Sequence, residues 1–249
     1  MTQTGFEWTP DFWQGWRESD NPYRKYKSER DRRLALEALQ PRDGEKILEV
    51  GCGYGWISTA LWDTARIEWY GVDRSEAMIR NIRSTRSNQA LRTSVVDGKQ
   101  LPFLDNTFDK VLCTGVLMHI ADDVAVIHEL LRVLRPKGAL LCSFNNALSP
   151  FSIPARIWNS RKKGFVQKFR TPGSMHGILS RAGAKLSHMA GDGIMATVPL
   201  SIGGVCFPPA RAFPIIQKMD DWAVHRFAWL AYEVWFIGIK SPPLCESSK

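Results

Sequence analysis

Short apolar runs alternate along the chain with longer stretches in which apolar side chains recur every three or four residues. The apolar runs predict buried strands at 46–50, 67–73, 91–97, 108–116 and 139–144. The intervening stretches predict helices at 22–40, 56–66, 75–85 and 122–134. Strands that are apolar on both faces must be covered on both sides. The alternation therefore predicts an α/β fold with a doubly wound, mostly parallel sheet.

The alternation loosens after residue 144. Further on, the pattern predicts helices at 171–182 and 210–226 and strands at 185–190 and 231–240. We expect an N-terminal helix or lid at 1–40, followed by one domain at 41–249. Within that domain, segments at 145–170 and 192–228 depart from the pattern and are predicted to cover a substrate. The tail at 241–249 is expected to fray.

Composition excludes several classes of protein. The 249 residues are 44% hydrophobic and 23% charged, which is ordinary for a globular protein and unlike a disordered one. The 33 Lys and Arg residues outnumber the 25 Asp and Glu residues and give a net charge of +8, which favours anionic partners. The five cysteines lack C-x-x-C spacing, so we expect neither a disulfide framework nor a metal site. With no secretory signal or uninterrupted apolar span, a cytoplasmic location is the expectation.

A glycine turn follows the first predicted strand. The residues Gly51, Gly53 and Gly55 let a ligand approach the backbone, and Asp73 follows the second strand, placed to accept hydrogen bonds from ribose hydroxyls. These features predict a nucleoside-binding βαβ unit. A dinucleotide turn needs G-x-G-x-x-G, but Trp56 stands where the third glycine would fall, which disfavours a nicotinamide dehydrogenase. A carboxylate at Glu49 would also repel a pyrophosphate, whereas it is able to orient a ligand amine.

Five segments together resemble one family. They read ILEVGCGYG, YGVDRSEAM, VVDGKQLPFLDNTFDKV, GVLMHI and ELLRVLRPKGALL, and they run in the family's order across about residues 45–144. In these segments the chain resembles the class I S-adenosylmethionine-dependent methyltransferases, in particular the methyltransferase type 11 group. The resemblance implies a Rossmann-like seven-stranded sheet whose last strand is antiparallel, with S-adenosyl-L-methionine as the cofactor.

The resemblance also implies a role for individual residues. The glycine turn would line the methionyl part of the cofactor, with Glu49 beneath it, Asp73 would hold the ribose, and Met78 would pack on the adenine. Asp97 would accept from the adenine amine, and the backbone of Thr114 and Gly115 would face the sulfonium. The complete predicted cofactor set is Glu49, Gly51, Cys52, Gly53, Tyr54, Asp73, Arg74, Met78, Asp97, Gly98, Thr114, Gly115 and Tyr26 of the N-terminal lid.

One histidine is a candidate catalytic residue. His119 lies four residues beyond Gly115, and an imidazole is able to take a substrate proton. The alternative is that His119 only packs or caps the next helix. Since positioning and exclusion of water are enough for an unprotonated nucleophile, the sequence requires no base. His176, before a later helix, is a weaker candidate.

A basic and aromatic block precedes the helix at 171–182. Its basic residues are Arg156, Arg161, Lys162, Lys163, Lys168 and Arg170, interleaved with Ile153, Ile157, Trp158, Phe165 and Phe169. Three interpretations stay open: a solvated loop over the active site, a peripheral membrane contact, and phosphate binding. The chain shows no N-P-P-Y motif and no RNA-binding module, which disfavours nucleic acid.

The sequence therefore predicts methyl transfer to an O, N or C nucleophile of a small-molecule or lipid-like substrate of the secondary-metabolite or quinone type. Two alternatives remain. One is a nucleic-acid or protein methyltransferase, which the basic charge would suit. The other is a protein that binds S-adenosylmethionine without chemistry. The acceptor atom and the oligomeric state are left open.

Overall fold

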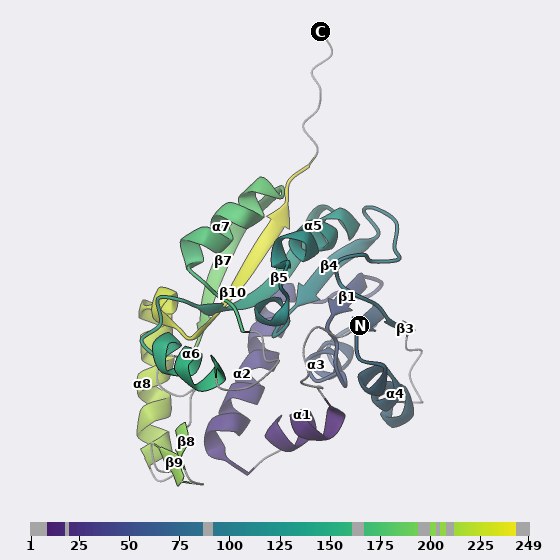
Figure 1. Ribbon diagram of the computed structural model, residues 1–249. Coiled ribbons are helices and arrows are strands. Elements are labelled where there is room, and N and C mark those ends of the chain that lie inside the picture. Colours follow the sequence, from purple (N-terminus) through teal and green to yellow (C-terminus); the bar gives the residue numbers. More distant parts are fainter. Residues whose placement is uncertain are drawn as a thin grey trace.

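The computed structural model describes residues 9–17, 20–86, 92–160, 167–193, 200–202, 205–207 and 212–242. Its centre is a sheet in the order β3-β2-β1-β4-β5-β10-β7, with a short β6 paired to the end of β5 (Figure 1). The main strands are β1 (Lys46–Val50), β2 (Glu68–Asp73), β3 (Arg92–Val95), β4 (Phe108–Cys113), β5 (Leu134–Asn146), β6 (Phe169–Arg170), β7 (Ala184–Asp192) and β10 (Glu233–Lys240).

Strand direction confirms the predicted fold class. The pairs β1–β2, β1–β4, β2–β3 and β4–β5 are parallel, whereas β10 runs antiparallel to both β5 and β7. A two-stranded hairpin of β8 (Leu200–Ile202) and β9 (Val205–Phe207) lies outside this sheet. Apart from the short β6, the seven other strands of this sheet thus form a Rossmann-like sheet, and β10, the last of them along the chain, is the antiparallel one.

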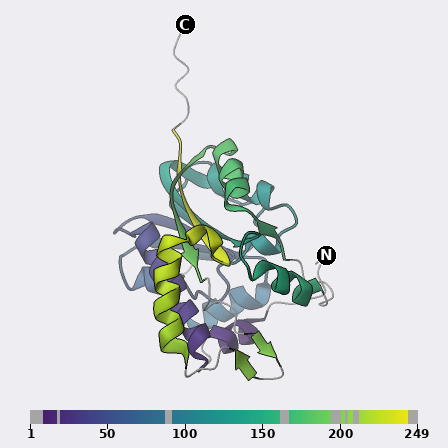
Figure 2. The same ribbon diagram turned by 90° about the vertical axis from the view of Figure 1, so that its left-hand side faces the viewer.

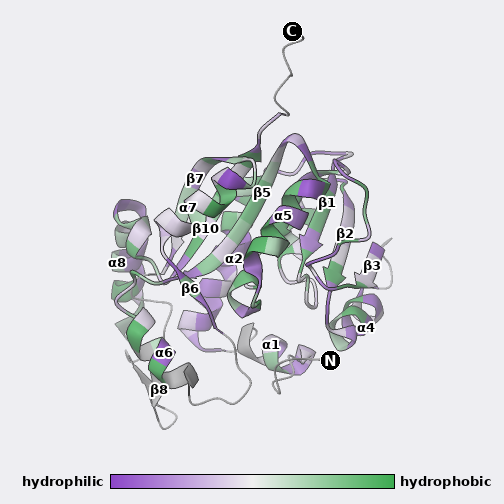
Figure 3. Ribbon diagram, turned by 45° about the horizontal axis from the view of Figure 1, so that its top comes forward, coloured by the Kyte–Doolittle hydropathy of each residue, from purple (hydrophilic) through white to green (hydrophobic). Residues whose placement is uncertain are grey.

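Helices cover both faces of the sheet. One face carries α2 (Pro22–Leu39), α3 (Ser58–Trp62) and α4 (Glu76–Thr85), and the other carries α5 (Asp123–Val133) and α7 (Pro172–Arg181). The remaining helices are α1 (Pro10–Arg17), η1 (Leu117–His119), α6 (Ser152–Ser160), α8 (Phe213–Arg226) and η3 (Ala228–Leu230). Figure 3 shows that hydrophobic residues concentrate on the strands and on the helix faces toward them, as burial of apolar surface requires.

Helix ends follow the expected capping chemistry. Asn21 accepts hydrogen bonds from the backbone of Tyr23 and Arg24 at the start of α2, and Ser75 accepts one from Met78 at the start of α4. Asp122 caps α5 in the same way. Within the described residues, no helix is long and apolar enough to cross a membrane.

Two predicted boundaries are wrong. The helix predicted at 56–66 is only Ser58–Trp62. The turn that contains the three glycines with positive φ angles extends through Ile57, so the helix begins only after it. The strand predicted at 139–144 runs from Leu134 to Asn146. Its start passes through Pro136 and Gly138 because an irregularity in the pairing with β4 accommodates them, and a Cβ at Gly138 would lie 2.7 Å from the Asp109 carbonyl oxygen.

A buried ionic cluster ties the N-terminal helix to the far end of the sheet. The Lys27 ammonium contacts the carboxylates of Asp31, Asp192 and Glu233. Arg30 lies 3.3 Å from Asp220 of α8 and donates to the Gly191 carbonyl oxygen at 2.8 Å. These contacts join α2 to β7, β10 and α8, which are more than 150 residues away in the sequence.

Burial shifts the acid–base equilibria of this cluster. Burial alone would lower the pKa of Lys27, but Asp192, Asp31 and Glu233 outweigh it and raise that pKa. Burial raises the pKa of Asp192 to about 7, although Lys27 and Arg30 pull it down. Asp192 therefore takes up a proton on folding at mildly acidic pH.

This proton uptake makes stability depend on pH. Because the pKa of Asp192 is raised on folding, its contribution is complete below the unfolded pKa of about 4 and is lost as pH rises through about 7. We expect Asp192→Asn to flatten the fall in the free energy of unfolding between pH 4 and 7, by up to about 1.4 kcal/mol per pH unit for one proton. Urea unfolding at several pH values measures this slope. Asp63→Asn, at an exposed position, is the control and should leave it unchanged. Equal slopes for wild type and Asp192→Asn would contradict the assignment.

Candidate functional site

The glycine turn between β1 and α3 has one open position. Gly51, Gly53 and Gly55 all hold positive φ angles, of 75°, 52° and 83°. A Cβ at Gly51 would lie 2.1 Å from the Val116 side chain, and one at Gly55 would lie 2.6 Å from Ile82. At Gly53 an added Cβ would meet nothing within 4 Å. Gly51 and Gly55 are thus glycine because the protein packs there, whereas Gly53 borders space that a ligand is able to enter.

A second open glycine ends the neighbouring strand. Gly115 follows β4 with a φ of 70°, and an added Cβ there would also meet nothing within 4 Å. Its N–H donates to the Ser143 hydroxyl at 2.9 Å. Because β1 and β4 pair in parallel, their carboxyl ends lie at the same edge of the sheet. Gly53 and Gly115 therefore leave backbone accessible on two adjacent strand ends, and Thr114 lies partly buried between Gly115 and β4.

Asp73 fixes the glycine turn to the end of β2. One carboxylate oxygen accepts from the Gly53 N–H at 2.9 Å, and the other accepts from the Ser75 N–H at 2.8 Å. Burial raises the pKa of Asp73, while the Ser75 and Gly53 hydrogen bonds and the nearby charge of the exposed Arg74 oppose the rise. Each carboxylate oxygen can accept more than one hydrogen bond, so Asp73 retains the capacity to accept from a ligand hydroxyl.

Three predicted cofactor residues are buried around the turn. Glu49 is 4% exposed and accepts a hydrogen bond from the Trp69 indole at 3.2 Å. Cys52 and Met78 are each 3% exposed, and burial raises the pKa of the Cys52 thiol well above its usual range. Tyr54 is partly buried, with its ring 6.3 Å from that of Trp56. The contacts of all four with a cofactor stay predictions.

Asp97 and Gly98 lie in the loop after β3. Asp97 is exposed and accepts from the Lys99 N–H at 3.0 Å, which is the behaviour of a residue that starts a turn. A Cβ at Gly98 would lie 3.2 Å from the Val50 side chain at the end of β1. Gly98 thus brings this loop against the strand that leads into the glycine turn. Recognition of adenine by Asp97 stays a prediction.

His119 ends the short helix η1 that follows Gly115. It is partly exposed, and its backbone N–H donates to the Val116 carbonyl oxygen at 2.9 Å. The adjacent Met118 carbonyl oxygen accepts from the Lys168 N–H at 2.7 Å, so the segment before α7 lies against η1. His176 is exposed on α7. The structure thus places His119, but not His176, beside one of the predicted substrate-covering segments.

Part of the basic block is paired within the protein. Lys168 and Arg170 both bind the carboxylate of Asp123, and although burial alone would raise the pKa of Asp123, these hydrogen bonds lower it. Arg156 lies over the Phe169 ring, 4.7 Å from its centroid. Arg161, Lys162, Lys163 and Phe165 lie outside the described residues, and the Trp158 side chain is likewise not described. Among the described basic residues of the block, Lys168 and Arg170 are therefore paired with a carboxylate.

Tyr26 of the predicted lid contacts α8. Its hydroxyl donates to Asp221 at 2.5 Å and accepts from Arg30 at 2.9 Å, and its ring packs edge-on against Phe213. Burial and the Asp221 hydrogen bond raise the pKa of Tyr26. These contacts place the hydroxyl in the interface between α2 and α8. Its predicted contact with the cofactor stays a prediction.

Sequence reasoning missed a group of buried polar side chains at the same edge of the sheet. Ser143 and Asn145 end β5, and Glu233 and Asp192 are register partners at the adjoining ends of β10 and β7. The Asn145 side-chain nitrogen is buried without a hydrogen-bond partner in the structure. The available signal was the change from apolar to polar residues in S-F-N-N at the end of β5. These side chains extend the edge from the glycine turn toward α2.

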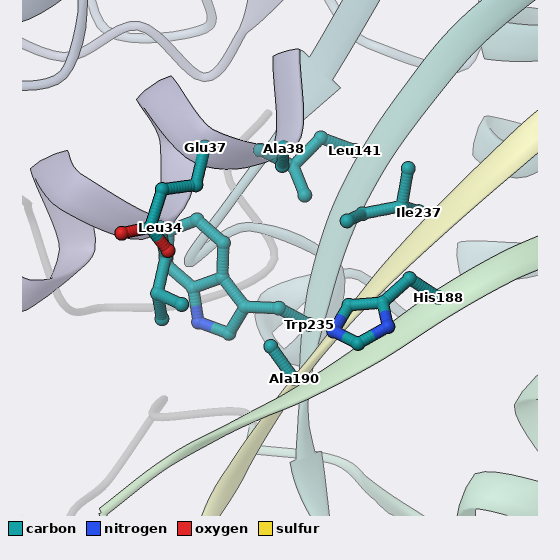
Figure 4. A pocket seen from close by; sticks show the side chains of 8 residues that line it. All are labelled: Leu34, Glu37, Ala38, Leu141, His188, Ala190, Trp235 and Ile237. Atoms are coloured by element: carbon teal, nitrogen blue, oxygen red, sulfur yellow. The ribbon is translucent and has the colours of Figure 1, made fainter. Parts of the chain in front are cut away.

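A separate cavity of about 190 Å³ lies between α2 and the face of the sheet (Figure 4). It is lined by Leu34, Glu37, Ala38, Leu141, His188, Ala190, Trp235 and Ile237. None of the predicted cofactor residues lines it. Among the described residues there is also no cluster of side chains suited to hold a metal ion.

Comparison with known proteins supports the assignment of this edge. Residues 48–142 match the family model described as a methyltransferase domain. The chain is 33% identical over 142 residues to a demethylmenaquinone methyltransferase of Beutenbergia cavernae, covering 57% of this chain and 55% of the relative. It is 30% identical over 108 residues to methyltransferase GfsG of Streptomyces halstedii, covering 42% of this chain and 39% of the relative.

A solved structure extends the comparison to the whole fold. A chain in the complex between the Haloferax volcanii Trm112 methyltransferase activator and a methyltransferase aligns with a TM-score of 0.65. The two chains are 22% identical, and the alignment covers 96% of this chain and 100% of that one, which establishes the shared fold.

The matched region and the fold point to one family. The chain spans between about a third and just over half of the length of the curated relatives that it matches. The matched region nevertheless contains the end of β1, the glycine turn, Asp73 and β4, which together form the candidate site. Residues 48–142 are therefore similar to the methyltransferase domain family, and the fold around them is the Rossmann-like fold of the solved methyltransferase structure.

Proposed function

We propose that this protein transfers a methyl group from S-adenosylmethionine to an O, N or C nucleophile of a small-molecule or lipid-like substrate. The observation that carries the proposal is the open Gly53 held by Asp73 at the end of β2, with the equally open Gly115 on the adjacent strand end. When bound, the cofactor supplies an electrophilic methyl group on a sulfonium. A positively charged ligand of this kind suits an edge with a carboxylate and no described basic residue inside the turn.

Each of the predicted residues is proposed to bind a different part of the cofactor. Gly53 admits it to the backbone of the turn, Asp73 accepts from its ribose hydroxyls, and Asp97 with Gly98 faces its adenine. The Gly115 backbone lies next to the reacting methyl group. Arg74 and Met78 border the ribose and the adenine. These roles agree with the observed open space and hydrogen-bonding capacity at Gly53, Gly115 and Asp73.

The substrate is proposed to lie over the carboxyl ends of β4 and β5. The N-terminal lid at 1–40 and the segments at 145–170 and 192–228 are its proposed covers. The contacts of the Lys168 backbone with η1 and of Tyr26 with α8 support this arrangement, because they join these segments to each other and to the edge of the sheet. Relatives named demethylmenaquinone methyltransferase favour a quinone-type substrate.

Fold alone does not establish chemistry, so turnover must be measured. The direct assay follows release of S-adenosylhomocysteine with a short-chain demethylmenaquinol as acceptor, beside a tRNA and a protein acceptor. Product with the quinol alone supports the proposal. Product with tRNA or protein would replace the substrate class, and cofactor binding without product from a broad acceptor panel would indicate a non-catalytic binding protein.

Cofactor affinity should depend on Gly53 and Asp73. We expect Gly53→Arg to abolish S-adenosylmethionine binding by filling the open space beside the turn. Asp73→Ala should weaken binding by about 1–3 kcal/mol for each charge-assisted hydrogen bond lost. Isothermal titration calorimetry measures both effects. Gly183→Arg is the matched control because Gly183 also has a positive φ, of 94°, and open space at its Cβ, but lies between α7 and β7. Unchanged affinity in the Gly53 and Asp73 variants would overturn the cofactor assignment.

We propose His119 as the group that accepts a proton from the substrate. His119→Ala should then lower turnover by about 10²-fold and remove the limb of the pH–rate profile near neutrality. Steady-state kinetics from pH 5 to 9 test this, with His176→Ala as a control that should keep both rate and profile. If His119→Ala keeps the wild-type profile and loses only thermal stability, the imidazole packs and does not act as a base.

A further inference from the structure

The outward face of α8 carries an apolar stripe. Ile215, Met219 and Trp222 are 67%, 50% and 66% exposed. Their spacing of four and three residues places them on one side of the helix. Figure 2 shows α8 running along the outside of the molecule, so this stripe faces away from the sheet. Large apolar side chains that gather on an exposed helix face indicate an interaction surface.

Basic residues share this face. Lys218, His225 and Arg226 are exposed, and their positions fall on the same side of the helix as the apolar stripe. All residues of α8 are described: of its two acidic residues, Asp220 is buried, and the Asp221 side chain is 40% exposed but is bound by the Tyr26 hydroxyl. The outward face, defined by Ile215, Lys218, Met219, Trp222, His225 and Arg226, is therefore both apolar and positively charged.

Contacts of Asp220, Asp221 and Phe213 with α2 fix the orientation of α8. Asp220 is fully buried and lies 3.3 Å from the Arg30 guanidinium. Asp221 accepts the Tyr26 hydroxyl at 2.5 Å. Phe213 packs edge-on against Tyr23, with ring centroids 5.0 Å apart. Rotation of the helix to bury Trp222 would break these contacts and separate Asp220 from Arg30, so the apolar stripe stays outside.

We propose that the outward face of α8 binds the surface of an anionic lipid membrane, with the helix lying in the plane of the interface. Trp, Met and Ile side chains enter the boundary between headgroups and acyl chains, while Lys and Arg approach the anionic headgroups. The net charge of +8 adds long-range attraction of the same sign. A lipid surface suits this face better than an acidic protein because the apolar stripe makes up its centre, Lys218 and Arg226 lie beside it, and the neighbouring carboxylate of Asp221 is bound by Tyr26.

This inference does not rest on methyl transfer. It also differs from the membrane interpretation of the basic block at 153–170, where Lys168 and Arg170 are paired with Asp123. Of that block, the exposed Ile153 and Ile157 of α6 offer a second apolar contact. The α8 surface carries the proposal on its own.

Vesicle flotation tests the proposal with the full chain. The probes are vesicles of phosphatidylcholine with about 30% phosphatidylglycerol and vesicles of phosphatidylcholine alone, at low and at physiological salt. The wild-type protein should float with the anionic vesicles. The double variant Ile215→Ser with Trp222→Ser should bind at least tenfold more weakly at either salt concentration. Lys218→Gln with Arg226→Gln should weaken binding at low salt by about 25-fold, since each charge contributes about fivefold.

The matched control is Leu104→Ser, which removes an 83% exposed leucine from a loop far from α8 in the sequence and should leave flotation unchanged. Circular dichroism shows whether each variant is folded. If the Ile215 and Trp222 variant does not fold, the Lys218 and Arg226 variant still tests the surface. Wild-type protein that stays unbound, or an α8 variant that floats like the wild type, would overturn the proposal. A wild-type dimer that the Ile215 and Trp222 substitutions convert to monomer would do so as well, because the face would then be an interface between copies.

Discussion

Parallel pairing of β1 with both β2 and β4 is the constraint on which the rest of this structure depends. It brings the carboxyl ends of three strands to one edge, although they are separated by more than 60 residues of sequence. Asp73 then connects two of these ends through its hydrogen bond to the Gly53 N–H. This arrangement positions the glycine turn, the Gly115 backbone and the candidate base His119. Methyl transfer needs little more from a protein than positioning and exclusion of water, and this edge supplies the positioning.

The second organising feature is the buried ionic cluster around Lys27 and Arg30. A buried charge is costly unless it is paired, so the cluster holds α2, the strand ends and α8 in one relative arrangement. The same contacts turn the acidic side of α8 inward and its tryptophan outward. The N-terminal helix, the proposed substrate cover and the proposed membrane surface are therefore consequences of one set of ion pairs.

Most of the fold could be predicted from the sequence because local patterns determine it. A short apolar run such as 46–50 predicts a strand that is covered on both faces. The caps at Asn21, Ser75 and Asp122 accept hydrogen bonds from residues within four positions of them. The sequence could not show that Gly51 and Gly55 are packed while Gly53 is open, because that difference depends on Val116 and Ile82 from other elements. It also missed the Asp192 cluster and the contact of Tyr26 with α8, since both join residues more than 150 positions apart. The roles of the site residues toward a cofactor remain predictions.

Hydrogen exchange of the full chain, followed by mass spectrometry with and without S-adenosylhomocysteine, tests the central claim most directly. The account predicts that the ligand slows exchange at residues 51–55, 73–75 and 114–116, the three strand ends that parallel pairing brings together. It predicts no change at 34–38 and 188–190, which border the separate cavity beneath α2. Protection of the cavity residues with none at the glycine turn would contradict it.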